Sequence, residues 1–351
     1  MSFPCIKINL RKISNNARLI NDRCALKGIS VVAVTKSILA DIEIVKILKK
    51  SGINIFGDSR LENLVKLRKY FGYGQELVLL RTPMISECEK MLDVCNTSMQ
   101  TELSTIKTIS DICERKNKKH NIILMVEMDD KREGISARRT IPFFDEIFKK
   151  YPRIKIKGLA TNARCISKRR PRINSIENLI EIKKRISSRY GYAIPVVSGG
   201  NSSIWKYIED NSIPEGINEV RIGEAIFIGN ETSGYEKING TFSDSFILEA
   251  EVIERKIKKG FVYKFIIALG IQDVPCKHLI IQNPCYDIIA QSSDHTVIGL
   301  KKTYLDGLVK NKMDGLILPE PEVGDRIIFG LDYFGLMFSM TSPFIKKIYI
   351  K

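Results

Sequence analysis

One lysine stands at the end of a short apolar segment near the start of the chain. Residues 31–35 read Val-Val-Ala-Val-Thr, a composition typical of a buried strand, and Lys36 follows at once. A lysine amine that has lost its proton is a nucleophile and attacks aldehydes to form a Schiff base. The alternative for Lys36 alone is a solvated surface charge, so a catalytic role depends on the residues that accompany it.

A second segment has the composition of a phosphate-binding loop. Residues 198–203 read Ser-Gly-Gly-Asn-Ser-Ser, and a helical stretch begins at Ile204. Glycines let the backbone approach an anion closely, hydroxyls donate hydrogen bonds to it, and the N-terminus of a helix offers unpaired N–H groups. An ordinary turn has the same composition, so this loop also needs supporting residues.

An arginine interrupts a third apolar run, residues 219–226, which read Glu-Val-Arg-Ile-Gly-Glu-Ala-Ile. Burying a guanidinium is costly unless it is paired, so the pattern predicts a partner for Arg221. On its own this would be a structural ion pair. Beside Lys36 and a phosphate loop, Arg221 fits a position facing the pyridine nitrogen of pyridoxal phosphate, which it would keep unprotonated because guanidinium holds its proton at neutral pH.

These residues require a scaffold that gathers strand ends. Apolar runs alternate with amphipathic segments such as 42–48 and 175–182, which indicates βα units around a parallel sheet. The predicted strands are 31–34, 53–56, 77–80, 97–100, 122–128, 154–160, 194–197 and 219–222. Eight strands close a TIM barrel, in which catalytic groups lie at the C-terminal strand ends. A doubly wound open sheet would show the same alternation.

The pattern changes from about residue 230. Glycine, proline and aspartate turns now separate strand-like segments, which are 246–253, 261–268, 279–281, 296–300, 326–329 and 345–350. We therefore expect an α/β protein with an N-terminal (β/α)8 TIM barrel over residues 1–230 and a C-terminal all-β domain over residues 231–351.

Composition narrows the class of protein. The chain has 351 residues and a formal net charge of +16, but its basic residues are spread over many predicted helix faces, with the densest cluster at residues 167–172. This distribution favours attraction of small anions over nucleic acid as the primary partner. No apolar stretch is long enough to span a membrane, which predicts a cytoplasmic protein, and the 8 cysteines form neither metal-binding nor disulfide patterns.

Taken together, the motifs resemble one family. Their order along the chain is Val-Ala-Val-Thr-Lys36, Glu127-Met-Asp-Asp-Lys-Arg132-Glu-Gly134, Gly158-Leu-Ala-Thr-Asn162, residues 198–203 and Val220-Arg-Ile-Gly223. This order resembles the fold-type III alanine racemase superfamily, and within it the alanine/ornithine racemase branch. The resemblance extends over essentially the whole chain, including the β domain.

The resemblance implies a pyridoxal 5'-phosphate enzyme that interconverts L- and D-amino acids by removing the α-proton. Lys36 would form the Schiff base and act as the base on one face of the substrate. Arg132 would lie near the cofactor's phenolic oxygen and the substrate carboxylate, and Asn162 takes the place of a histidine that packs on the cofactor ring in alanine racemases. The remaining cofactor contacts implied by the resemblance are Asn201, Ser202, Ser203, Arg221, Gly223 and Glu224.

Racemisation also needs a proton donor on the opposite face. Alanine racemases use a tyrosine from the β domain of a partner subunit, but the matching segment here, residues 270–274, has Ile271 in that place. Candidates nearby are Asp273 and a Ser-Ser-Asp-His stretch that ends in Asp294 and His295, where histidine has a pKa suited to proton transfer near neutrality. The resemblance implies a homodimer with active sites shared between subunits.

The substrate is indicated less directly. Met128-Asp-Asp-Lys131 replaces a small uncharged stretch of alanine racemases, and Asp130 in it is predicted to receive the ammonium of ornithine or lysine, with Ser293 also near the substrate. The alternative is a solvated acidic loop. A racemase of alanine or serine, or a noncatalytic pyridoxal phosphate carrier, stays open; the cysteine-containing motif of fold-type III decarboxylases is not found.

Overall fold

The computed structural model describes residues 3–167, 170–258, 261–309 and 320–351. It divides into two compact units. The barrel unit comprises Ile13–Lys36 and Ala40–Phe242, and the β unit comprises Met1–Lys12, Ser37–Leu39 and Ser243–Lys351. Each unit is described by itself.

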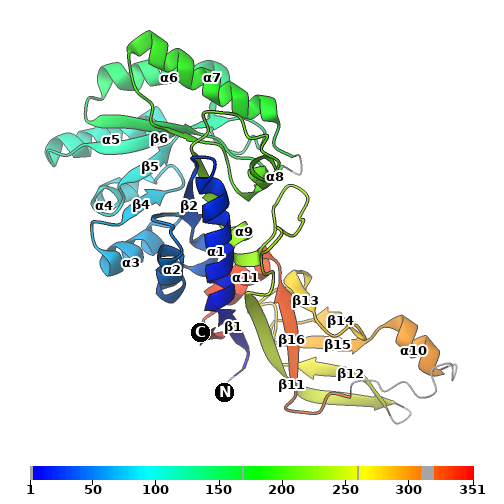
Figure 1. The fold of residues 1–351 in the computed structure, drawn as a ribbon. Coiled ribbons are helices and arrows are strands. Elements are labelled where there is room, and N and C mark those ends of the chain that lie inside the picture. Colours follow the sequence, from blue (N-terminus) through cyan, green and yellow to red (C-terminus); the bar gives the residue numbers. More distant parts are fainter. Residues whose placement is uncertain (1–2, 168–169, 259–260, 310–319) are drawn as a thin grey trace. The chain divides into compact units, whose positions relative to one another are not determined.

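Eight parallel strands form the barrel unit, and they close into a ring (Figure 1). In ring order they are β2 (Ser30–Val34), β3 (Ile55–Asp58), β4 (Glu76–Leu79), β5 (Thr97–Gln100), β6 (His120–Glu127), β8 (Ile154–Ala160), β9 (Val196–Ser198) and β10 (Glu219–Ile222). Pairing of β5 with β6 and of β10 with β2 completes the ring. The predicted TIM barrel is thus confirmed, and the open sheet is excluded.

Helices surround the strands on the outside of the barrel (Figure 1). They are α1 (Leu10–Ala25), α2 (Ile42–Lys50), α3 (Leu61–Phe71), α4 (Cys88–Val94), α5 (Leu103–Arg115), α6 (Ala137–Lys150), α7 (Ile173–Tyr190), α8 (Trp205–Glu209) and α9 (Glu224–Ile228). Short 3-10 turns precede three of them, namely η1 (Lys36–Ile38), η2 (Ile85–Glu87) and η3 (Ser202–Ile204). At the start of α2, Asp41 caps the helix, because its side chain accepts hydrogen bonds from two backbone amides.

Part of the barrel interior is apolar. A cluster of buried side chains fills it, consisting of Met99, Ile123, Met125 and Ala160, with Leu80 and Val196 packed against it. Charged side chains also enter the barrel, because Lys157 on β8 pairs with Glu76 on the non-adjacent strand β4, and the buried Glu219 on β10 lies within range of both charges.

The β unit is built on a mostly antiparallel sheet. Its strands are β1 (Cys5–Asn9), β11 (Phe246–Lys258), β12 (Phe261–Ile267), β13 (Leu279–Ile281), β14 (Tyr286–Gln291), β15 (Thr296–Leu300), β16 (Arg326–Leu331) and β17 (Lys346–Ile350). The order is β13-β16-β11-β12-β15-β14, and β1 lies between β11 and β17. The predicted β domain is confirmed, although it also holds η4 (Cys276–His278), α10 (Lys302–Val309) and α11 (Tyr333–Thr341).

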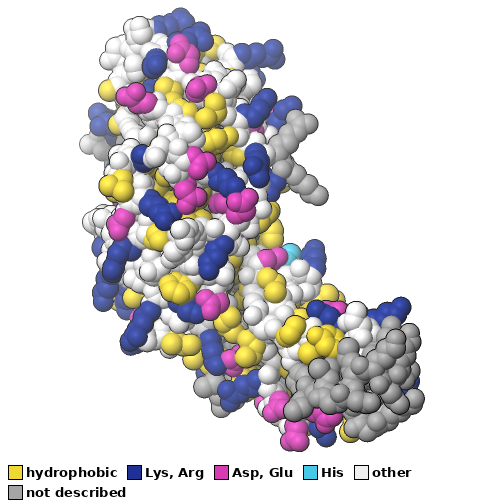
Figure 2. Space-filling view, turned by 45° about the vertical axis from the view of Figure 1, so that its right-hand side comes forward, with side chains coloured by type: hydrophobic (Ala, Val, Ile, Leu, Met, Phe, Trp, Pro, Cys, Tyr) yellow, Lys and Arg dark blue, Asp and Glu magenta, His cyan; other side chains and the backbone are white. Residues whose placement is uncertain are grey.

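Charged side chains are intermixed on the surface. Figure 2 shows Lys and Arg interspersed with Asp and Glu over the face in view, among the residues described. Within the predicted basic cluster at 167–172, Lys168 and Arg169 lie outside the described residues. No helix in the described part of the chain is long and apolar enough to cross a membrane.

Candidate active site

Lys36 lies at the mouth of the barrel, just after the C-terminal end of β2. β2 ends at Val34, the buried Thr35 follows, and Lys36 begins η1 with its side chain exposed, so the ammonium is less desolvated than a buried lysine would be. Leu39 and Ala40 then adopt left-handed conformations, with φ of 50° and 47°. Such backbone is costly for residues with a Cβ, and it turns the chain sharply away from the strand directly after Lys36.

A buried carboxylate lies beside the lysine segment. Asp58, at the end of β3, accepts hydrogen bonds from Thr35 Oγ1 at 2.7 Å, from the amide of Arg60 at 2.8 Å and from Asn63 Nδ2 at 3.1 Å. Burial raises the pKa of Asp58, while these bonds and the positive charge of Lys36 act in the opposite direction. Asp58 therefore holds Thr35 in place, and with it the backbone from which the Lys36 side chain extends.

The Gly/Ser loop follows β9, as the sequence predicts for a seventh strand. Gly200 has φ +143°, and a Cβ on Gly199 would lie 2.9 Å from Ile217 Cγ2. Asn201 caps η3, because its Oδ1 accepts the amide of Ser203 at 2.9 Å while its Nδ2 donates to the carbonyl of Ala163 at 2.8 Å. Only glycine fits the two positions that bend this loop tightly.

Two hydroxyls of this loop are buried. Ser202 Oγ accepts the amide of Ala225 at 3.3 Å, which joins the loop to the first turn of α9. Ser203 Oγ has no hydrogen-bond partner although it is buried. Gly223 and Glu224 begin α9, and a Cβ on Gly223 would stand 3.0 Å from the carbonyl of Val34. A buried hydroxyl without a partner beside two helix starts is suited to an anion.

Arg221 is buried in β10 and only 3% exposed. Its Nη1 donates to Ser198 Oγ at 2.5 Å, and its Nη2 donates to Asn162 Oδ1 at 2.6 Å and to the carbonyl of Thr161. The predicted partner is therefore a set of neutral acceptors rather than a hydrogen-bonded ion pair. Burial lowers the pKa of Arg221, and the nearby carboxylate of Glu219 opposes that shift.

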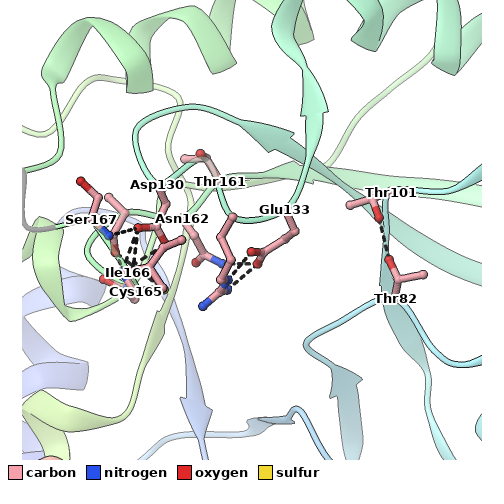
Figure 3. Close-up of polar contacts among 12 residues, drawn as sticks. Thr82, Thr101, Asp130, Glu133, Thr161, Asn162, Cys165, Ile166 and Ser167 are labelled. Atoms are coloured by element: carbon pink, nitrogen blue, oxygen red, sulfur yellow. Dashed lines mark hydrogen bonds and ion pairs between the residues drawn. The ribbon is translucent and has the colours of Figure 1, made fainter.

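Glu133 and Asn162 meet at the mouth of the barrel (Figure 3), and Arg132 contacts Glu133 there. Both carboxylate oxygens of Glu133 accept from Arg132, at Nε and Nη2, and Asn162 Nδ2 donates to Glu133 Oε1 at 3.2 Å. The segment is positioned by a two-residue strand, β7 (Ile135–Ser136), which pairs with the end of β6. Gly134 permits this approach, because a Cβ there would lie 2.5 Å from the amide of Glu127.

The two aspartates of the same loop hold other parts of the chain. Asp130 is 6% exposed and accepts the amides of Cys165, Ile166 and Ser167 at 3.0–3.1 Å. Asp129 accepts from the amide of Arg172 and, at 2.7 Å, from its Nε. These bonds tie the loop after β8 to the loop after β6 (Figure 3), so the role of Asp130 in substrate binding stays a prediction.

In the β unit, two loops carry the predicted proton donors. His295 Nδ1 lies 3.1 Å from Asp294 Oδ1, which also accepts from the hydroxyls of Ser292 and Ser293 at 3.1 Å. These bonds lower the pKa of Asp294. Asp273 is buried instead, and its carboxylate accepts the amide of Gly270 at 3.2 Å and Ser342 Oγ at 3.1 Å. Both His295 and Asp294 are exposed, whereas Asp273 is held within its own turn.

Sequence reasoning missed several polar residues at the barrel mouth. Glu133 lies within the motif at residues 127–134, directly after Arg132. A negative charge next to that arginine was the feature that could have indicated the pairing. Thr82 and Thr101 follow β4 and β5, and their hydroxyls lie 2.9 Å apart (Figure 3). Single threonines after strands carry no pattern that distinguishes them from ordinary loop residues.

Chemically, the barrel mouth combines three functions. Lys36 supplies an amine, Ser203 supplies a buried hydroxyl for an anion, and Arg221 supplies a fixed cation that keeps its proton. This set can bind a phosphorylated aldehyde through its phosphate and offer it an amine.

Comparison with known proteins is consistent with this chemistry. The family described as alanine racemase, N-terminal domain, matches residues 8–231. Lysine racemase of Thermotoga maritima is 31% identical over 370 residues, which cover 99% of each chain. Ornithine racemase of Acetoanaerobium sticklandii is 31% identical over 366 residues, 98% of this chain and 99% of the relative.

A solved structure agrees in fold. Alanine racemase from Bartonella henselae, determined with covalently bound pyridoxal phosphate, is 17% identical and aligns over 100% of both chains with a TM-score of 0.73. The likeness thus includes the β unit as well as the barrel. On the match of residues 8–231 and the two full-length relatives, this chain belongs to the alanine racemase family.

Proposed function

We propose that this protein is a pyridoxal 5'-phosphate-dependent amino-acid racemase whose substrates are basic amino acids, ornithine and lysine foremost. The observation that carries the proposal is the placement of Lys36, the Gly/Ser loop and Arg221 after or within the first, seventh and eighth strands of one closed barrel. Full-length similarity to a lysine racemase and an ornithine racemase supports the reaction and the substrate class.

The residues present fit the cofactor. The unpartnered hydroxyl of Ser203, with Ser202, Asn201 and the start of α9 at Gly223 and Glu224, would hold its phosphate. Lys36 would hold its aldehyde carbon, and Arg221 would face its ring nitrogen. When bound, the cofactor makes the α-proton of an amino acid acidic by delocalising the negative charge that its removal leaves behind.

This chain's own residues then bind the substrate and move the proton. Arg132 would receive the substrate carboxylate, since guanidinium and carboxylate match in geometry and charge. The Nζ of Lys36 would take the α-proton on one face and return it. Asn162 and Arg221, which are joined at 2.6 Å, would keep the ring side of the site rigid.

A proton must also arrive on the opposite face. We assign this step to His295, with Asp294 orienting its ring at 3.1 Å and Ser293 beside the substrate. As in the family resemblance, the residue would come from the β unit of a second copy, so the active enzyme would be a homodimer. Asp273 is the weaker candidate, because both of its oxygens already accept hydrogen bonds.

The test is α-proton exchange in deuterated water. Wild-type protein loaded with pyridoxal phosphate should incorporate deuterium at the α position of both enantiomers of ornithine and lysine, and interconvert them. Lys36→Ala should reduce exchange at least about 10²-fold, the usual contribution of a positioned base. Lys69→Ala, an exposed lysine on α3, is the matched control and should behave as wild type.

The same assay decides the alternatives. Exchange in alanine or serine alone would replace the substrate assignment while keeping the reaction. A cofactor absorbance without exchange in any amino acid of a broad panel would contradict the enzyme assignment and favour a pyridoxal phosphate carrier. Undiminished exchange in Lys36→Ala would remove Lys36 from the reaction.

A further inference from the structure

A single carboxylate joins the two arginines of the site. Glu133 accepts from Arg132 at both oxygens, and Asn162 Nδ2 donates to its Oε1 at 3.2 Å. Asn162 Oδ1 in turn accepts from Arg221 Nη2 at 2.6 Å. Four side chains from the ends of β6, β8 and β10 therefore form one continuous hydrogen-bonded series.

The order of charges along this series fixes its geometry. Two guanidinium groups can only donate, so they cannot bond one another, and their charges repel. Asn162 turns its oxygen toward Arg221 and its amide nitrogen toward Glu133, and the carboxylate closes the series at Arg132. If Glu133 lost its charge, the amide of Asn162 would have a cation on each side.

The carboxylate is ionised in this setting. Burial and the negative charge of Asp130 would raise the pKa of Glu133. The hydrogen bonds from Arg132 and Asn162 and the charge of Arg132 outweigh these two effects, so the pKa of Glu133 is lowered. The same pairing raises the pKa of Arg132. Their side chains are 32% and 38% exposed, so the pair lies at the rim of the site rather than in free solvent.

The pairing also orients Arg132. Glu133 engages Nε and Nη2, so Nη1 is the nitrogen directed away from the carboxylate. A guanidinium held along one edge can present the rest of its plane to an incoming carboxylate or phenolic oxygen without first losing rotamer freedom.

We propose that Glu133 is a positioning residue for racemisation, which fixes Arg132 toward the substrate and couples it through Asn162 to Arg221. The inference rests on the proposed function and adds to it a residue that acts through another group. A competing role for Glu133, direct binding of the side-chain ammonium of ornithine, would require oxygens that are already occupied by Arg132 and Asn162.

The experiment compares Glu133→Gln and Glu133→Asp with Glu146→Gln, a matched control in which the carboxylate on α6 that pairs with Lys150 is neutralised. Without substrate, the pH midpoint of the cofactor absorbance in Glu133→Gln should fall by about half a unit or more, because an unopposed Arg132 cation disfavours any nearby protonated group. With substrate, kcat should fall about tenfold for ornithine and alanine alike, while KM changes less than about threefold. Glu133→Asp should recover part of kcat.

Two results would overturn the proposal. One is a spectrum and kinetics indistinguishable from Glu146→Gln. The other is a rise in KM confined to ornithine and lysine, which would make Glu133 a substrate-binding residue.

A readout without cofactor separates this proposal from the proposed function. In a double-mutant cycle on the thermal unfolding of the apoprotein, Glu133→Gln and Asn162→Ala should be non-additive, because both break the same series. Additive effects would count against the series. If wild-type protein shows no α-proton exchange, the racemase assignment fails. The pH midpoint of the cofactor absorbance and the double-mutant cycle would still test whether Glu133 positions Arg132 and couples to Asn162.

Discussion

Three acidic side chains in one loop have separate tasks. Asp129 binds Arg172 before α7, Asp130 binds the amides of residues 165–167, and Glu133 binds Arg132. From sequence, this run of acids predicts either an ammonium receptor or a solvated loop. The structure gives it a third role, in which acids hold neighbouring loops and an arginine in place around the barrel mouth.

The role of Asp130 can be tested with Asp130→Asn. Asparagine keeps one acceptor oxygen but sets an amide nitrogen against backbone donors, so we expect a loss of about 1–3 kcal/mol in the free energy of unfolding by denaturant. Backbone hydrogen bonds lower the pKa of Asp130 despite its burial. Its contribution is therefore complete above the unfolded-state pKa of about 4 and should fade as the pH falls through the lower folded-state pKa.

The control is Asp111→Asn, an exposed aspartate on α5. If Asp130 anchors the loop, its substitution should alter KM for ornithine and alanine by similar factors. An unchanged stability together with a rise in KM for ornithine and lysine alone would instead restore Asp130 as the ammonium receptor.

At the scale of elements, the loop that carries His295 is shaped by its neighbour. The amide of Ile271 donates to the carbonyl of Ser292 at 2.9 Å, and the amide of Gln272 donates to that of Ser293 at 3.1 Å. Close contact at Gly270 makes these bonds possible. Residues 270–274, which lack the family's tyrosine, therefore still support the loop at residues 292–295.

Gly270→Ala should show whether the position of the 292–295 loop matters for the reaction while the barrel stays folded. A Cβ at this position would lie 2.1 Å from the carbonyl of Ser293 and 2.3 Å from Asp294, so the loop must shift. We expect the racemisation rate to fall at least about tenfold, since misplacement of a catalytic group by about 1 Å is costly. The cofactor absorbance should stay unchanged because the barrel is untouched.

Gly74→Ala is the control, as a Cβ there meets nothing within 4 Å. A normal racemisation rate in Gly270→Ala would show that the 292–295 loop is not part of the active site. A lost cofactor absorbance would show that the substitution acts through folding.

The same scale shows what sequence could and could not predict. The barrel strands were found because parallel strands buried on both faces are continuous apolar runs. β14 was missed because it is an edge strand that pairs with β15, only its first residue, Tyr286, is fully buried, and its apolar run is only three residues long, Ile288 to Ala290. Lys36, Ser203 and Arg221 stood in local motifs, whereas the Glu133–Asn162 contact joins two loops and has no local pattern.

For the whole molecule, the proposal divides each active site between two copies. Lys36 belongs to the barrel unit and His295 to the β unit. If the site takes one residue from each subunit, a variant that lacks Lys36 and a variant that lacks His295 have complementary defects. A dimer of the two would contain one site with both residues and one site with neither.

Co-expression of Lys36→Ala and His295→Gln with different affinity tags tests this arrangement. Each variant alone should be nearly inactive in racemisation, which needs both residues. The purified heterodimer should recover about half of the wild-type racemisation rate, because one of two sites is intact. An inactive heterodimer would place His295 in the same subunit's site or outside the reaction. Recovery should disappear when both substitutions are on one chain.

The pairing of β1 has a consequence for synthesis. β1 leaves the ribosome before the barrel, but the strands that flank it, β11 and β17, follow after residue 242. The barrel can fold as a nascent domain while the backbone N–H and C=O groups on both edges of β1 are still unpaired. Translation of residues 346–350 supplies β17, which pairs with the second edge of β1.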